Sequence, residues 1–304
     1  MIKNITYNEI LKLWLNNKTD IKIQSKLTYE RIINKYLINS VGKININKLK
    51  YENIENLFSN LKDISISTKK ILFYIVKSSI KYAYSNKYCN YINLSNIKFK
   101  MPNKTIFVLS KEEQNRLENV LKNKINIRKL SILLCLYTGV RLGEVCGLKW
   151  KDIDFSNKSL NVNKTIERIK NDDGNSKTKL IISTPKSETS NRIVPIPDFL
   201  VELLKQFKKN DNYYILSNSN KLYDPRLLES FYKRILTKVG IKQNKFHTLR
   251  HSFSTRCIES KMDIKTLSEI LGHSQVETTL KLYVHPSYDL KKSSIEHLVE
   301  FMAN

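Results

Sequence analysis

The stretch that most constrains the fold is residues 246–274, FHTLRHSFSTRCIESKMDIKTLSEILGHS. On a helix, His247 and Arg250 lie three residues apart and share one face, so imidazole and guanidinium point into the same space. Apolar residues flank these two positions in FHTLRHSFSTRCI (246–258), which favours a pocket over bulk water. Two cationic groups side by side repel each other, and an anion between them would relieve this cost. Gly272 is expected to end a helix as its C-cap and to hold His273 there.

Three other segments carry groups that can do chemistry. In TGVRLGE (138–144), Arg141 follows a turn and opens a helix, and Glu144 is close enough to touch it. Lys186 lies in the turn TPKSETSNR (184–192) at the tip of a hairpin, and Tyr283 lies in TTLKLYVHP (278–286). Taken singly, an arginine with a glutamate three residues on is ordinarily a surface pair, and a tyrosine in an apolar helix is ordinarily core.

The residues around these segments predict a mainly α-helical domain with a small antiparallel sheet, an α+β fold. Ser110 and Glu113 form a capping box that starts a helix, and a further helical stretch covers 127–137. Short β-branched segments lie within 153–196, where NDDGN (171–175) forms a turn. Helical patterning then returns, at 198–209 and 224–239 and on to the chain end.

The first hundred residues predict a separate helical domain. Apolar residues recur at helical spacing in 27–39 and 69–84. The second segment holds four aromatic residues that we expect in the core: Phe73, Tyr74, Tyr82 and Tyr84.

The helical periodicity lapses near Pro102, so we place an interdomain linker at 101–108. The chain then divides into a domain at 1–100 and a domain at 109–304. The basic residues in and before the linker, Lys98, Lys100 and Lys104, are expected to follow a phosphate backbone.

The charge of the chain favours a polyanionic partner. Lys and Arg total 53 against 28 Asp and Glu, a formal net charge of +25. Residues 1–100 hold 18 basic and 6 acidic side chains, so both domains are basic. A general bias towards Asn, Ile and Lys is the alternative, but it does not explain the shortage of acids in the first hundred residues. A nucleic acid that touches both domains explains the pattern.

Several protein classes are disfavoured by the composition. The four cysteines have no CxxC spacing, so we expect neither a disulfide framework nor a zinc site, and no carboxylate cluster indicates a magnesium site. No run of about 18 apolar residues predicts a membrane span. The N-terminal residues lack the pattern of a secretion signal, so we expect a cytoplasmic protein of a bacterium, associated with the nucleoid.

Taken together, the candidate residues resemble the active-site signature of the tyrosine recombinases, also called the phage integrase family. The resemblance rests on six residues in order: Arg141, Lys186, His247, Arg250, His273 and Tyr283. It also covers their surroundings, TGVRLGEVCGLKW, residues 246–274 and TTLKLYVH, and more loosely residues 6–100. Six roles in order make a chance match very rare.

The resemblance implies an enzyme that cuts and rejoins DNA strands without a metal ion, other cofactor or ATP. Tyr283 would be the nucleophile that forms a 3′-phosphotyrosine, with the two arginines holding the phosphate. His247 is the candidate base and Lys186 the candidate acid. His273 would donate a hydrogen bond to the phosphate, and Glu144 would orient the arginines.

The resemblance also implies an architecture: a core-binding (SAM-like) domain and a catalytic domain that clamp double-stranded DNA, with four subunits on two duplexes exchanging strands through a Holliday junction. Residues 289–304 carry an apolar stripe of Ile295, Leu298, Val299 and Met302. This tail either packs on its own domain or docks into a neighbouring subunit.

Several readings of the biological role stay open. The surroundings of the motifs favour a mobile-element integrase over a Xer-type chromosome-dimer resolvase. A type IB topoisomerase-like enzyme shares the chemistry, and a non-catalytic DNA-binding regulator shares the fold but would be expected to lose catalytic residues.

Overall fold

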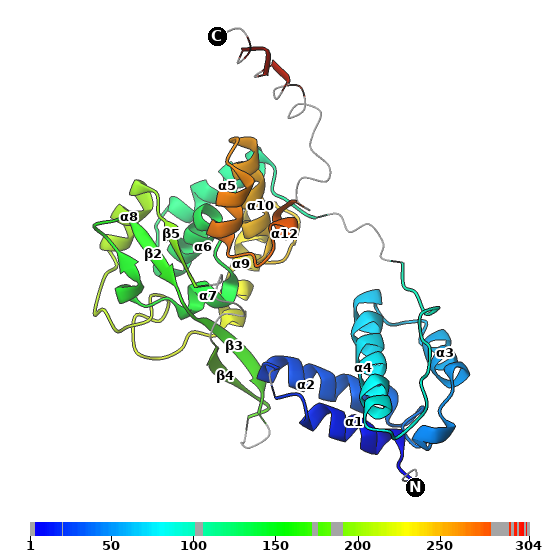
Figure 1. The fold of residues 1–304 in the computed structure, drawn as a ribbon. Coiled ribbons are helices and arrows are strands. Elements are labelled where there is room, and N and C mark those ends of the chain that lie inside the picture. The colour runs from blue at the N-terminus through cyan, green and yellow to red at the C-terminus, as the bar shows by residue number, and fades with distance from the viewer. Residues whose placement is uncertain are drawn as a thin grey trace. The chain divides into compact units, whose positions relative to one another are not determined.

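The chain folds into two compact units, residues 1–105 and 106–304 (Figure 1). The computed structural model describes residues 4–19, 21–100, 106–171, 176–183 and 191–280, and in the tail residues 292, 295, 296, 298–300 and 302. The boundary between the units falls within the segment predicted as a linker. Among the described residues, no helix combines the length and apolar character that a membrane span requires.

Unit 1 is helical. Its elements are α1 (Tyr7–Asn16), α2 (Ile23–Ile32) with a π-helical continuation (Ile33–Leu37), a short 3₁₀ turn (Ile46–Lys48), α3 (Tyr51–Asn60) and α4 (Ile66–Ser85). Buried apolar residues from all of these helices form one core. Helices α1 and α4 are further joined inside it, where the Tyr7 hydroxyl and the Ser79 hydroxyl lie 2.8 Å apart in a buried hydrogen bond.

Helix α4 confirms the helix predicted at 69–84, but its aromatic residues divide between core and surface. Phe73 and Tyr82 pack against the core. Tyr74 and Tyr84 are 45% and 50% exposed, so the expectation of core positions was wrong for these two. The helix buries only one stripe of its surface, and both tyrosines lie away from that stripe.

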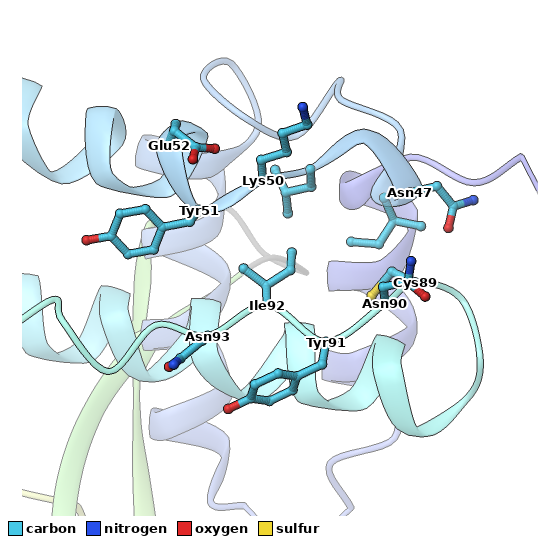
Figure 2. A pocket seen from close by; sticks show the side chains of 11 residues that line it. Asn47, Lys50, Tyr51, Glu52, Cys89, Asn90, Tyr91, Ile92 and Asn93 are labelled. Atoms are coloured by element: carbon cyan, nitrogen blue, oxygen red, sulfur yellow. The ribbon is translucent and has the colours of Figure 1, made fainter.

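A hollow of about 380 Å³ lies in unit 1 between the start of α3 and the segment that follows α4 (Figure 2). Lys50, Tyr51 and Glu52 line it from one side, and Cys89 and Tyr91 are among the residues that line it from the other. No candidate catalytic residue contributes to its lining.

Unit 2 combines helices with two small sheets. Its helices are α5 (Lys111–Lys122), α6 (Ile127–Thr138), α7 (Leu142–Gly147), α8 (Asp198–Lys205), α9 (Pro225–Lys238), α10 (Thr248–Glu259), α11 (Ile264–Leu271) and α12 (Val276–Leu280), with a 3₁₀ turn at Trp150–Asp152. Its strands are β1 (Ile153–Asp154), β2 (Ser159–Val162), β3 (Thr165–Lys170), β4 (Thr178–Ser183) and β5 (Arg192–Pro195).

The predicted antiparallel region is present as two sheets instead of one. One sheet has the order β1-β2-β5, and the other is the pair β3-β4. Strand β2 pairs antiparallel with β5, matching Leu160 with Val194, so the β3-β4 hairpin is inserted between two paired strands. The turn predicted at 171–175 falls almost wholly outside the described residues.

Helix α6 is the centre of unit 2 and sets the position of the candidate site. Its residues from Leu130 to Leu136 are all buried, as expected for a helix enclosed by others. Helices α5, α7, α8, α9 and α10 contact it. The capping box predicted at Ser110 and Glu113 is confirmed at the start of α5.

Helix α6 ends at Gly139, where φ is +66°. A β-carbon at this position would lie 2.5 Å from Cδ1 of Phe253 and 2.8 Å from Cδ2 of Leu271. Glycine is therefore required both for the left-handed backbone and for the close approach of α10 and α11. This turn leads directly into Arg141.

Candidate active site

Arg141 and Glu144 form a linked pair at the start of α7. Arg141 is the N-cap residue, and its backbone N–H donates to Oε2 of Glu144 at 2.8 Å. Its Nη1 donates to Oε1 of Glu144 at 2.6 Å. The Arg141 side chain keeps 35% of its surface exposed, whereas Glu144 is buried. The carboxylate thus anchors a guanidinium that stays open to a ligand.

Arg250 lies in the first turn of α10 and is buried, with 3% of its surface exposed. Its Nη1 donates to the carbonyl oxygen of Gly139 at 2.8 Å, and its Nη2 donates to that of Leu271 at 2.6 Å. These contacts use two of the five donors of the guanidinium. Arg250 therefore joins the end of α6 to the end of α11.

His273 follows the C-cap of α11. Gly272 has φ +63°, in the left-handed region, which confirms the predicted C-cap. The helix therefore ends directly before His273. Nδ1 of His273 lies 2.8 Å from the hydroxyl oxygen of Thr279. When that hydroxyl donates to Nδ1, the proton of the neutral ring is on Nε2, which can donate to a ligand.

The arginines and His273 converge on one turn. Arg250 donates to the Leu271 carbonyl, and Nη2 of Arg141 lies 3.5 Å from the Gly272 carbonyl oxygen. Two guanidinium groups that are 109 positions apart in the sequence thus reach adjacent carbonyls, directly before His273. A helix end exposes carbonyls without intrahelical partners, so the cations also satisfy these groups.

His247 stands at the N-cap of α10, and its ring meets that of His251 edge to face with 4.6 Å between centroids. The residue is exposed at the surface, but partial burial of its imidazole, followed by the effects of His251 and Arg250, together lower its pKa to about 4. The ring is therefore neutral at neutral pH and able to accept a proton.

Two other groups of the cluster, His273 and Arg250, also have shifted pKa values. Burial, and then the charges of Arg250 and Arg141, lower the pKa of His273 to about 4. Burial, and then the charge of Arg141, lower the pKa of Arg250 to about 9. At this value the guanidinium is still charged at neutral pH. Cations and neutral imidazoles together form a site suited to an anion.

Sequence reasoning missed Arg192, the first residue of β5. Its Nη2 donates to Oε2 of Glu144 at 2.9 Å, and its Nε donates to the Ile270 carbonyl oxygen at 2.6 Å. The one available signal was an arginine inside the apolar strand segment NRIVPI. Its partners are 48 and 78 positions away, so local spacing gave no indication of them.

The structure therefore brings together Arg141, Glu144, His247, Arg250 and His273. Lys186, Tyr283 and Lys104 lie outside the described residues. In unit 1, Lys98 and Lys100 are exposed on either side of Phe99, whose ring lies close to those of Phe58 and Phe73.

The tail predicted as a helix at 289–304 is described at only a few positions, all helical. Its apolar residues Ile295, Leu298, Val299 and Met302 are exposed.

Two family models match the chain. Residues 107–289, more than half of its length, match the phage integrase family, and residues 6–62 match the N-terminal SAM-like domain of phage integrases. The chain therefore belongs to the phage integrase family, the tyrosine recombinases, as its motifs predicted.

The chain is similar in sequence to a tyrosine recombinase and to a transposase. The chain is 34% identical over 212 residues to the XerC-like tyrosine recombinase of Caldanaerobacter subterraneus subsp. tengcongensis, covering 64% of this chain and 54% of that protein. It is 27% identical over 212 residues to the transposase from transposon Tn916 of Enterococcus faecalis, covering 63% and 51%. The matched region thus spans about half the length of these two relatives.

Solved integrase structures share the fold. The Tn1549 transposon integrase in complex with a circular intermediate DNA matches 97% of this chain and 99% of that one, with a TM-score of 0.77 and 20% identity. The lambda integrase tetramer bound to a Holliday junction matches 89% and 78%, with a TM-score of 0.64 and 15% identity. The predicted fold class, mainly α with small antiparallel sheets, is confirmed.

Proposed function

We propose that the chain is a site-specific DNA recombinase that cleaves and rejoins strands through a 3′-phosphotyrosine intermediate. The observation that carries the proposal is the convergence of Arg141 and Arg250 on adjacent carbonyls beside His273. Forked guanidinium donors match the free oxygens of a phosphodiester. Such fixed donors, aimed at the charge that develops during attack, contribute about 10²–10³ in rate each.

In the first step, the Tyr283 oxygen attacks phosphorus and the bond from phosphorus to the 5′-oxygen breaks. His247 accepts the phenol proton, since a free tyrosine with a pKa of about 10 is mostly protonated at neutral pH. Lys186 donates a proton to the departing 5′-oxygen. Arg141, Arg250 and the Nε2–H of His273 hold the two free oxygens of the phosphate.

In the second step, a 5′-hydroxyl from another strand attacks the phosphotyrosine and releases Tyr283. One phosphodiester is broken and one is formed, so the exchange needs no ATP. We assign metal-independent chemistry, with the guanidinium groups supplying the positive charge. Four subunits on two duplexes would each carry out one such exchange, in two rounds with a Holliday junction between them, and the tail helix would link neighbours.

DNA would be held between the two units. The basic character of both units supports this arrangement, as do the exposed Lys98 and Lys100, next to a segment that contains Lys104. The binding should weaken steeply with salt, because each phosphate contact releases counterions.

The proposal is tested by covalent capture. The wild-type chain is incubated with fragments of the DNA that flanks its gene, denatured in detergent, and analysed for protein that migrates with DNA. We expect a covalent complex on a small set of fragments. A non-catalytic regulator would give none, and a topoisomerase would also relax supercoiled plasmids that lack any site. Sequencing the captured DNA would separate element ends, expected for an integrase, from a single chromosomal site, expected for a resolvase.

The pH dependence of cleavage should reflect the low pKa values of His247 and His273. An imidazole whose pKa is lowered stays neutral until the pH falls to that value. His247 can therefore accept a proton well below pH 6.5. At subsaturating DNA, the pH dependence of the cleavage rate reports the pKa values of the free protein. We expect the rate to stay constant as the pH is lowered to about 5 and to fall below that pH.

At saturating DNA this fall in rate should move to higher pH, because a bound phosphate favours the imidazolium form. Single-turnover cleavage in buffers of constant ionic strength measures both profiles. A fall in rate centred near the ordinary histidine value of about 6.5 at subsaturating DNA would contradict the assignment of these groups.

A further inference from the structure

Arg192 and Glu144 form a buried ion pair behind the candidate site. Nη2 of Arg192 lies 2.9 Å from Oε2 of Glu144, and Nη1 lies 3.2 Å from Oε1. Only 5% of each side chain is exposed. Paired parallel contacts of this kind fix the plane of the guanidinium as well as its distance from the carboxylate.

Glu144 is shared between two arginines. Its Oε1 also accepts from Nη1 of Arg141 at 2.6 Å, and its Oε2 accepts from the Arg141 backbone N–H. Burial raises the pKa of Glu144, but the contact with Arg192 and the charge of Arg141 lower it more, to about 2. A single negative charge is thus divided between two cations, and the trio carries a net charge of +1.

Arg192 also holds the end of α11. Its Nε donates to the Ile270 carbonyl oxygen at 2.6 Å. The next two carbonyls, of Leu271 and Gly272, face Arg250 and Arg141. Three arginines from three different elements therefore donate hydrogen bonds to three successive carbonyl oxygens, immediately before His273. Arg192 ties β5 to both α7 and this turn.

We propose that Arg192 is a positioning residue for DNA cleavage, which balances Glu144 so that Arg141 stays available to the phosphate. The inference rests on the proposed function of the site. Without Arg192, the charge of Glu144 would be balanced by Arg141 alone. That pair would be neutral, its hydrogen bonds would tighten, and the site would lose one positive charge. The end of α11 would also lose a donor next to His273.

The test uses the full chain and a nicked suicide substrate, in single turnovers at saturating DNA and at a temperature well below the Tm of every variant. Arg192→Met is expected to lower the cleavage rate constant about 100-fold, comparable to the loss of one fixed donor. Arg192→Lys should fall between it and the wild type, because it keeps the charge and loses the fork.

The double variant Arg192→Met/Glu144→Gln distinguishes two possible causes of the slower cleavage: the unbalanced charge of Glu144 and the lost packing of the Arg192 side chain. It removes the unbalanced carboxylate and frees Arg141, so the rate constant should recover about tenfold relative to Arg192→Met. Removing both members of a buried pair also avoids leaving a lone buried charge.

The matched control is Arg168→Met, which breaks another partly buried pair of unit 2, between Arg168 and Asp224. It should lower Tm and leave the cleavage rate constant of the folded protein unchanged. If folded Arg192→Met cleaves as fast as Arg168→Met, or if the double variant is no faster than Arg192→Met, the inference is overturned while the proposed function stands. Failure of the wild-type chain to form the adduct overturns both.

Discussion

Tyr283→Phe should abolish the covalent complex with DNA. The phenol oxygen is the atom that would form the new bond to phosphorus, and phenylalanine removes only that atom. We expect the cleavage rate to fall by at least roughly 10⁴-fold, as when the nucleophile of a covalent catalyst is lost. A suicide substrate analysed on a denaturing gel measures the effect. Binding of the same DNA, measured by gel mobility, should change little.

Tyr288→Phe is the matched control, because it removes a hydroxyl five residues further along the same segment. It should form the adduct at the wild-type rate. A covalent complex that persists in Tyr283→Phe, or that disappears in Tyr288→Phe, would show that the nucleophile has been assigned to the wrong residue.

Arg250→Lys should lower the cleavage rate constant about 10²–10³-fold. Lysine keeps a positive charge but cannot reach the Gly139 carbonyl, the Leu271 carbonyl and a phosphate at once. The variant should also be less stable, by roughly 1–3 kcal/mol for each buried carbonyl that loses its donor. Thermal unfolding and single-turnover cleavage, measured on the same preparation, separate the two effects.

Arg256→Lys provides the comparison on the same helix. Arg256 donates to the Leu109 carbonyl and contacts Gln114 and Glu259, away from the candidate site. It should lose stability without losing cleavage by the folded protein. Equal cleavage losses in Arg250→Lys and Arg256→Lys would mean that Arg250 acts only through the fold.

The parts of the site that sequence predicted are those set by local geometry. The pairing of Arg141 with Glu144 follows from their three-residue spacing at a helix start. The turn at Gly272 follows from the left-handed backbone that glycine tolerates. The capping box at Ser110 is of the same kind, since each of its partners lies within one turn.

The parts that sequence did not predict depend on contacts between distant segments. Strand β2 pairs with β5 across an inserted hairpin, so the structure has two antiparallel sheets where the sequence predicted one. Arg192 reads as an ordinary strand residue until β5 is placed beside α7 and α11. Tyr74 and Tyr84 were assigned to the core from their aromatic character, but the face that α4 buries is decided by its neighbours.

The family resemblance added what neither spacing nor folding rules supplied. Five of the candidate residues meet in the structure, although the segments that carry them are scattered between 141 and 273. Local reasoning treated Arg141 as an ordinary surface residue and Tyr283 as an ordinary core residue. The order of the six residues of the family signature assigned both to one active site. The places of Lys186 and Tyr283 in the site stay predictions.

The central claim is that these dispersed side chains surround one phosphorus, which the phenolate of residue 283 attacks. Mass spectrometry of the trapped wild-type adduct, after digestion of both DNA and protein, tests this most directly. The account predicts a nucleotide joined through its 3′-phosphate to the peptide that contains Tyr283. A nucleotide on any other residue, a 5′-phosphate linkage, or DNA cut with no protein attached would contradict it.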